Sequence, residues 1–343
     1  MKKTTIIWLS MIVFISCTHR KQKNTYYEYK GFIAGTACII TYDKNAGNLD
    51  HEIQQMIREI DNSVVRENSS SLVSRINRND STGNADAHFI KLWQFSTQVY
   101  KQTEHAFDPT ASPLDDFWGD DPAKFKNPAK ADTAKIDSIR RLVSMENVSI
   151  AGNHTIVKKY ASTTIDFKHV YKGYMVDQVA DLLNSYNVAN YRIDIGDRIR
   201  AKGVNEAGKK WQIGIDEPTD DVKSRQLLAI ATLDNQAYAT AGSYKHYCAL
   251  GLMKLPYTID PRTSQPVKHT LLYTAVMAAS CAEADAYAAA FLVMGPEQTK
   301  VYINAHPDIQ AYLVSTNYKG EWVTFISNGL KEKLELIRQE NPI

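Results

Sequence analysis

The chain has 343 residues, of which 44% are hydrophobic, an ordinary proportion for a globular protein and enough for a sizeable core. Its 40 basic and 38 acidic residues leave a formal net charge of +2. A balance this even gives no reason to expect nucleic acid or an anionic membrane surface as the main partner.

Residues 1–16 have the pattern of a secretory signal peptide. Two lysines precede an apolar run from Ile6 to Ile15, which is too short to span a bilayer. The run leads into Phe-Ile-Ser-Cys, which resembles the lipobox of bacterial lipoproteins and ends at Cys17. Two acyl chains give stable anchoring, so we expect a lipoprotein held at the extracytoplasmic, periplasmic face of a membrane. A cleaved signal peptide with an incidental cysteine is the alternative.

Residues 17–30 are polar after the cysteine and predict a short lipidated tether, with folded structure starting near Gly31. The remaining cysteines are Cys38, Cys248 and Cys281, and none forms a CxxC pair. This odd number and spacing indicate neither a disulfide framework nor a zinc site.

Hydrophobic periodicity predicts both helices and strands along the rest of the chain. Apolar residues at helical spacing predict helices over residues 53–64, 89–100, 132–142, 172–183 and 282–295. Runs of β-branched and aromatic residues predict strands over 32–42, 148–150, 155–157, 164–166, 191–195, 211–215, 227–233, 238–240, 309–314 and 322–326. Residues 115–131 predict an exposed loop.

The order of these elements predicts an α+β fold of mixed sheets with packed helices. Strands and helices do not alternate regularly, which argues against a doubly wound sheet. No internal repeat or linker divides the chain, so residues 31–343 are expected to form a single domain.

The helix predicted over 282–295 places Asp285 in its first turns, with Gly295 as the expected end. A carboxylate on such an alanine-rich surface needs an ion pair, a metal or a helix N-terminus as its partner. An aspartate that merely complements its own helix dipole is the alternative. The approach to the helix at Lys172-Gly173 presents backbone N–H groups and is a natural anion site.

Taken in order, several short motifs resemble the ApbE family of bacterial lipoproteins, the FAD:protein FMN transferases. The matching pieces are Gly35-Thr36, Ser71-x-x-Ser74-x-x-Asn77, Ala106-Phe107-Asp108-Pro109-Thr110, Pro113-Leu114, Trp118-Gly119, Asp166, Lys172-Gly173-Tyr174, Asp177, Ile195-Gly196, Trp211-x-Ile213-Gly214-Ile215, Ala239-Thr240, Gly242, Asp260-Pro261-Arg262-Thr263, Ala284-Asp285 and Met294-Gly295. This ordered set extends over about residues 31–327.

The resemblance implies that FAD and Mg²⁺ bind together and that the FMN half of FAD passes to a Ser or Thr hydroxyl of a target flavoprotein, with AMP leaving. Mg²⁺ suits this chemistry because it prefers oxygen ligands and bridges phosphate oxygens. The residues implied to bind the flavin nucleotide are Ala106, Phe107, Asp108, Asp166, Lys172 and Thr258. The implied metal ligands are Asp285 and the backbone carbonyl of His169.

The chain departs from the family pattern at functional positions. Tyr257 stands where the family has the catalytic His, and a phenol that titrates near 10 is a poor base at neutral pH. The catalytic base is therefore unassigned, with His169 and His246 as candidates. Ala289 replaces the Thr that helps to hold the metal, so one ligand is lost.

Two further departures put long side chains where the family has small or acidic residues. Lys168-His169 replace a Gly-Gly pair, and Asp197-Arg198 replace Gly-Asp. The chain is thus expected to be either a transferase, weakened by these changes, or a degenerate member that binds a nucleotide or a protein partner without turnover.

Overall fold

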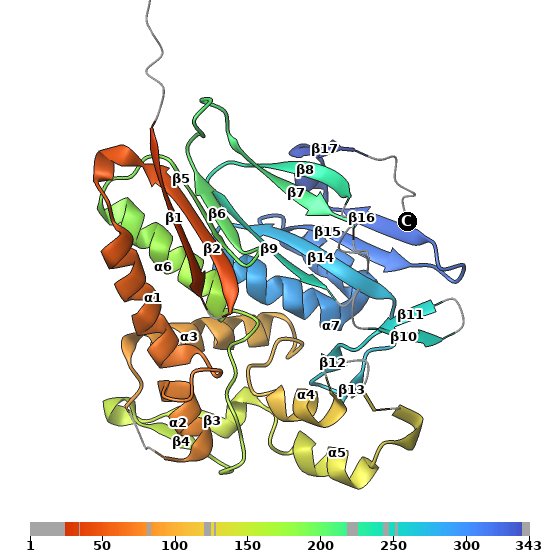
Figure 1. Ribbon diagram of the computed structural model, residues 1–343. Coiled ribbons are helices and arrows are strands. Elements are labelled where there is room, and N and C mark those ends of the chain that lie inside the picture. The colour runs from red at the N-terminus through yellow and green to blue at the C-terminus, as the bar shows by residue number, and fades with distance from the viewer. Residues whose placement is uncertain are drawn as a thin grey trace, which may run out of the picture.

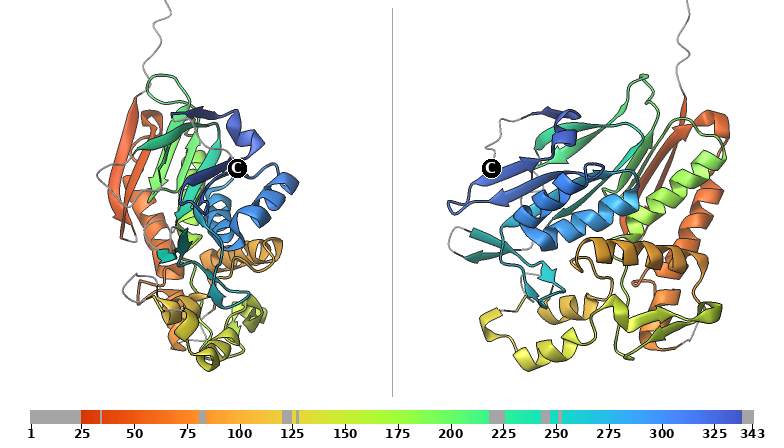
Figure 2. Two further views of the ribbon diagram at one scale, coloured as in Figure 1. Left: turned by 90° about the vertical axis from the view of Figure 1, so that its right-hand side faces the viewer. Right: turned by 180° about the vertical axis from the view of Figure 1, so that it is seen from behind.

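The computed structural model describes residues 25–337 except 34, 81–83, 120–124, 127, 218–225, 243–246, 251 and 252. Its centre is an eight-stranded sheet with two long helices on one face and a smaller sheet on the other (Figure 1; Figure 2). The predicted α+β class with packed helices is confirmed, and every ladder in the described part of the chain is antiparallel.

The fold begins with a hairpin at one edge of the large sheet. Strand β1 (Tyr26–Ile33) pairs with β2 (Thr36–Asp43), and Gly35 takes a positive φ of 72° at the turn. The single strand predicted over 32–42 is therefore two strands. The predicted boundary between tether and domain is wrong too, because β1 is already paired from Tyr26. Alternate burial along β1, and the edge-on packing of Tyr26 against Trp211, hold this segment in the sheet.

The large sheet continues from the hairpin towards the C-terminal strands. Its order is β1-β2-β5-β6-β9-β14-β15-β16, with β5 (Tyr191–Ile195), β6 (Ile199–Lys202), β9 (Gln236–Gly242), β14 (Leu271–Ala278), β15 (Gln310–Thr316) and β16 (Trp322–Ile326). All residues of β14 are buried. The smaller sheet consists of β17 (Leu334–Leu336), β8 (Leu227–Leu233) and β7 (Trp211–Asp216), and it shares an apolar cluster with residues of β6, β9, β14 and β15.

Helices α6 (Tyr171–Ser185) and α7 (Cys281–Ala305) cover the other face of the large sheet. Helix α1 (Asp50–Val64) packs on α6, and α2 (Leu72–Arg78) and α3 (Ala87–Gln102) pack on α1, while α4 (Ser112–Trp118) and α5 (Thr133–Arg140) lie at one end of the fold. The smaller elements are the hairpins β3 (Val148–Ile150) with β4 (Ile156–Lys158), β10 (Tyr247–Leu250) with β11 (Met253–Pro256) and β12 (Ile259–Asp260) with β13 (Gln265–Pro266), helix α8 (Asn328–Lys331), and 3₁₀ turns at Lys44–Ala46, Pro128–Lys130, Met145–Asn147 and Gly152–His154. No helix of the described residues is both long and apolar enough to cross a membrane.

The sequence predicted two elements, over residues 164–166 and 115–131, that the structure does not contain as predicted. Residues 164–166 form no strand; the side chain of Asn77 donates to the carbonyl oxygen of Ile165 and accepts from its backbone N. The loop predicted over 115–131 begins instead with the second half of α4, because Leu114 and Trp118 are fully buried and fix a helix there.

Helix α7 lies close to its neighbours because it is rich in alanine. Thr274 of β14 donates its hydroxyl to the carbonyl of Ala288 at 2.9 Å, a contact between sheet and helix that a larger side chain would prevent. Gly295 interrupts the helix with a φ of 77° and is followed by Pro296, as expected for the end of the first helical segment. The crossing with α6 is tighter still, because Gly173 lies against the backbone of Cys281.

We predict that Gly173→Ala destabilises the protein. The added Cβ would lie 2.3 Å from the carbonyl oxygen of Cys281, and a backbone atom cannot swing aside. The strain should cost about 1–3 kcal/mol, which exceeds the gain in helix propensity. Urea unfolding measures the difference. The matched control is Gly152→Ala, whose Cβ would meet nothing within 4 Å; equal stability of the two variants would contradict the close crossing.

Candidate active site

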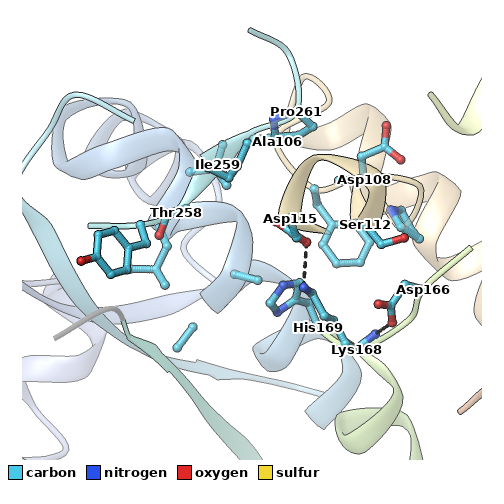
Figure 3. Close-up of a pocket in the computed structure, with 18 of the residues that line it drawn as sticks. Ala106, Asp108, Ser112, Asp115, Asp166, Lys168, His169, Thr258, Ile259 and Pro261 are labelled. Atoms are coloured by element: carbon cyan, nitrogen blue, oxygen red, sulfur yellow. Dashed lines mark hydrogen bonds and ion pairs between the residues drawn. The ribbon is translucent and has the colours of Figure 1, made fainter. Parts of the chain in front are cut away.

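A cavity of about 480 Å³ opens between α4, the segment before α6, β9, β12 and α7 (Figure 3). Its volume is within the range typical of small-molecule sites. Eight of the residues that the resemblance assigns to the flavin, metal or catalytic positions line it: Ala106, Phe107, Asp108, Asp166, His169, Tyr257, Thr258 and Ala289. The fold therefore gathers segments that are far apart in the chain at one place.

Lys172 and Asp285 are not among the residues that line this cavity. Lys172 lies half-buried in the first turn of α6, where burial and the nearby Arg198 lower its pKa. Asp285 is 1% exposed and meets the cavity through Arg198, which does line it.

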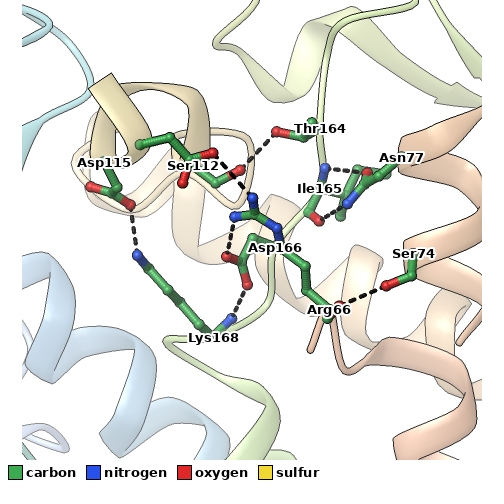
Figure 4. Close-up of polar contacts among 10 residues, drawn as sticks. Arg66, Ser74, Asn77, Ser112, Asp115, Thr164, Ile165, Asp166 and Lys168 are labelled. Atoms are coloured by element: carbon green, nitrogen blue, oxygen red, sulfur yellow. Dashed lines mark hydrogen bonds and ion pairs between the residues drawn. The ribbon is translucent and has the colours of Figure 1, made fainter. Parts of the chain in front are cut away.

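Two carboxylates on the α4 side of the cavity, Asp115 and Asp166, are each paired with a cation of the chain (Figure 4). Arg66 Nη1 lies 3.1 Å from Asp166 Oδ2, and Lys168 Nζ lies 2.7 Å from Asp115 Oδ2. Burial alone would lower the pKa of Lys168, but the Asp115 carboxylate raises it above its usual value. Lys168 is therefore charged, and its long side chain occupies part of the pocket wall.

The Ser71-x-x-Ser74-x-x-Asn77 motif sets the position of this network. The Ser71 hydroxyl caps α2 by accepting from Ser74 N at 3.1 Å. The Ser74 hydroxyl donates to the carbonyl of Arg66 at 2.7 Å, and Asn77 forms two hydrogen bonds of 2.8 Å with the backbone of Ile165. One short helix thus orients both Arg66 and the residue that precedes Asp166.

Asp108 forms a tight turn at the edge of the cavity. Its Oδ1 accepts hydrogen bonds from the backbone N and the hydroxyl of Thr110, at 2.7 and 2.6 Å. Burial raises the pKa of Asp108 to about 6, although both hydrogen bonds oppose this shift.

We predict that Asp108→Asn stabilises the protein in a pH-dependent way. A carboxyl that titrates near 4 when unfolded and about 6 when folded costs stability as pH rises through this window. The variant keeps an oxygen acceptor for Thr110 but carries no charge. It should be more stable than wild type at pH 7, by on the order of 1–3 kcal/mol, and the difference should shrink towards zero near pH 3.

Urea unfolding at several pH values measures this difference. Asp137→Asn, at an exposed position of α5, is the control for removing a surface carboxylate. A gain that stays the same at both ends of the pH range would show that burial of the charge is not its cause.

The Asp285 carboxylate has two partners within the chain. Its Oδ1 accepts from Arg198 Nε at 2.9 Å, and its Oδ2 accepts from Gly173 N at 3.2 Å. The Asp285 and Arg198 side chains are only 2% and 19% exposed. The ion pair and the helix N-terminus, two of the partners expected for this aspartate, are thus both present.

The side chains around Asp285 do not fit the magnesium ion that the resemblance implies. Both oxygens of Asp285 are engaged by donors of the chain, and Ala289 carries no side-chain oxygen. Mg²⁺ needs several oxygen ligands in near-octahedral geometry. No group of three or more His, Cys, Asp or Glu side chains among the described residues could hold a metal ion.

Neither Tyr257 nor His169 is a strong general base in this cavity. The ring of Tyr257 stacks on Phe125, with centroids 4.0 Å apart and 23° between the planes. His169 borders the cavity, where crowding by protein atoms and the positive charges of Lys168 and Arg198 lower its pKa. Its imidazole is therefore neutral and weakly basic, and His246 lies outside the described residues.

The sequence did not single out Arg66 or Asp115 as site residues. Their partners lie 100 and 53 residues away in the chain, so only the folded structure brings each pair together. The one signal was their charge, which is uninformative in segments interpreted as surface.

Comparisons with known proteins identify the family of the chain. The model of the ApbE family matches residues 34–313. An FAD:protein FMN transferase from Haemophilus influenzae is 30% identical over 291 residues, which cover 83% of each chain. The FAD:protein FMN transferase from Vibrio cholerae is 27% identical over 324 residues, covering 92% of this chain and 95% of that one.

Solved structures match as well. The flavin transferase ApbE from Vibrio cholerae aligns with a TM-score of 0.77 at 26% identity, over 90% of this chain and 99% of that chain. The apo form of the Pseudomonas stutzeri flavinyl transferase ApbE gives a TM-score of 0.77 at 25% identity, over 91% and 98%. The fold is therefore that of the flavin transferases. The chain belongs to the ApbE family.

Proposed function

We propose that the chain is an FAD:protein FMN transferase that binds FAD in this cavity and passes FMN to a Ser or Thr hydroxyl of a target flavoprotein. The observation that carries the proposal is the convergence of the implied flavin residues on one cavity: Ala106, Phe107, Asp108, Asp166 and Thr258 all line it. The named activity of relatives that align over most of the chain supports the same conclusion.

The proposed reaction is a displacement at phosphorus. The acceptor hydroxyl oxygen bonds to the FMN phosphorus of FAD, the bond from that phosphorus to the bridging oxygen breaks, and AMP leaves with that oxygen. The hydroxyl proton passes to a base or to the departing AMP. The chain supplies binding, orientation and positive charge near the phosphates, which are the main contributions to phosphoryl transfer.

A second candidate function is nucleotide binding without turnover. It is favoured by the stacking of Tyr257 on Phe125 at the position where the family has its catalytic His. A stacked phenol can donate a hydrogen bond but is a weak base at neutral pH. The two functions differ in whether bound FAD is ever cleaved.

We predict that Tyr257→His raises the rate of FMN transfer. A positioned general base typically contributes about 10²–10⁴-fold, so even partial restoration should be measurable. The full-length chain in detergent is incubated with FAD and a flavoprotein domain that carries an acceptor Thr. Covalent flavin is then quantified by its fluorescence in denaturing gels, and FAD binding is measured separately.

Two variants serve as controls. Tyr257→Phe keeps the aromatic ring against Phe125 and removes only the hydroxyl, so it should not gain activity. A Thr→Val change in the acceptor should abolish labelling. If both wild type and Tyr257→His bind FAD but neither transfers FMN, the second candidate function is favoured. If neither protein binds FAD, the flavin proposal is wrong.

We also propose that the protein is a membrane-anchored lipoprotein on the periplasmic side, attached through Cys17. The support comes from the two N-terminal lysines, the apolar run from Ile6 to Ile15 and the small residue before the cysteine. These residues lie outside the described part of the structure.

Cys17→Ala should release the protein from the membrane fraction, because without acyl chains no other anchor is expected. Cell fractionation measures the change, and labelled palmitate should enter wild type but not the variant. A variant that stays in the membrane, together with an unlabelled wild type, would show that lipid does not anchor this chain.

A further inference from the structure

We propose that the guanidinium of Arg198 takes the place of the divalent cation in this site. It pairs with Asp285 and offers its outward N–H groups to the phosphates of bound FAD, so that FAD binding needs no metal ion. This inference rests on the proposed function, because it assumes that FAD is the ligand.

The position of Arg198 is fixed by the backbone before it. The turn between β5 and β6 has Gly196 and Asp197 at its centre, with φ of 58° and 64°. Arg198 N donates to the carbonyl of Ile195, and Ile195 N donates to the carbonyl of Arg198. Two positive φ values in a row are typical of the tight two-residue hairpin turn. A Cβ on Gly196 would lie 2.6 Å from Thr36 Oγ1, so the turn is also wedged against β2.

The contacts of the guanidinium leave it able to bind an anion. Its Nε donates to Asp285 at 2.9 Å and its Nη1 donates to the carbonyl of Gly196 at 2.9 Å. A guanidinium has five N–H groups, so these two hydrogen bonds leave three. Arg198 lines the cavity, and its planar group suits bidentate contact with phosphate.

The Arg198–Asp285 pair resists exchange for a metal ion. Both side chains are largely withdrawn from water, and removing one partner of such a pair leaves a buried charge at a cost of several kcal/mol. Mg²⁺ loses its water reluctantly, and Ala289 offers no oxygen in compensation. The arginine cannot be deprotonated at any ordinary pH, so its charge is permanent.

Arg198 and Lys172 lie near each other at the start of α6. The charge of Lys168 is already matched by Asp115, and that of Asp285 by Arg198 itself. Burial and the nearby Arg198 lower the pKa of Lys172, while the carboxylates of Asp285, Glu67 and Asp197 act in the opposite direction. The proposed phosphate contact therefore rests on the three remaining N–H groups of Arg198 and not on an excess of positive charge.

The test separates the binding role of Arg198 from its structural role. Arg198→Gln with Asp285→Asn removes both charges together, so that no buried carboxylate is left unpaired. Arg198→Lys keeps the charge but loses the planar fork. FAD binding to the full-length chain in detergent is measured by flavin fluorescence in excess EDTA and in excess MgCl₂, and thermal melting checks the fold. Binding of Mn²⁺ to the protein without FAD is measured by electron paramagnetic resonance, with Asp285→Asn for comparison.

Wild type should bind FAD equally well in EDTA and in MgCl₂, and should bind no Mn²⁺. The double variant should melt near the wild-type temperature but bind FAD about tenfold or more weakly in both buffers, as expected for loss of charged hydrogen bonds. Arg198→Lys should fall between the two.

Three results would overturn the inference: loss of wild-type FAD binding in EDTA, binding of Mn²⁺ by wild type that Asp285→Asn removes, or equal FAD affinity in wild type and the double variant. Failure of wild type to bind FAD in either buffer would instead refute the proposed function and the phosphate contact with it. The Mn²⁺ measurement would then still decide whether Arg198 keeps a metal ion from Asp285.

Discussion

The structure depends on one buried carboxylate that joins its two central helices. Asp177 of α6 accepts hydrogen bonds from the first backbone N–H groups of α7, those of Cys281 and Ala282, at 2.9 and 2.8 Å, and pairs with Arg200 of β6 at 2.6 Å. These contacts fix the positions, and hence the register, of α6, α7 and the large sheet relative to one another. Asp285 lies one turn after Cys281 on the same face of α7, so this register also brings it to the N-terminus of α6.

Because of this register, most charged side chains of the active site form ion pairs with other side chains of the chain. Arg66, Lys168 and Arg198 each hold a carboxylate of the site, and two of these cations stand where the family pattern has no basic residue. A ligand therefore meets a preformed network rather than a set of unpaired acids. Such a network is costly to desolvate but orients its members before any ligand arrives.

The predictability of each element from the sequence follows from how it is buried. Helices α1, α3 and α5 have one buried face, and α6 is buried over most of Tyr171–Ala180, but the apolar residues of all four keep the helical spacing that predicted them correctly. Strand β14 is buried on both faces and shows no alternation, and nothing in its sequence distinguished it. Cavity residues were found through ordered motifs. The ion pair between Arg198 and Asp285 could not be predicted from the sequence, because its two residues lie 87 positions apart in the chain.

The place where the chain enters the fold bears on how a target could approach. Strand β1 starts at the end of the large sheet remote from α4 and α5, and the cavity lies on the side of α4 (Figure 1; Figure 2). A membrane attachment upstream of Tyr26 would thus leave the cavity at the part of the fold remote from the lipid. A partner could dock there without competing with lipid headgroups for space, so a soluble domain, or one that extends well beyond the bilayer, would reach the cavity most directly.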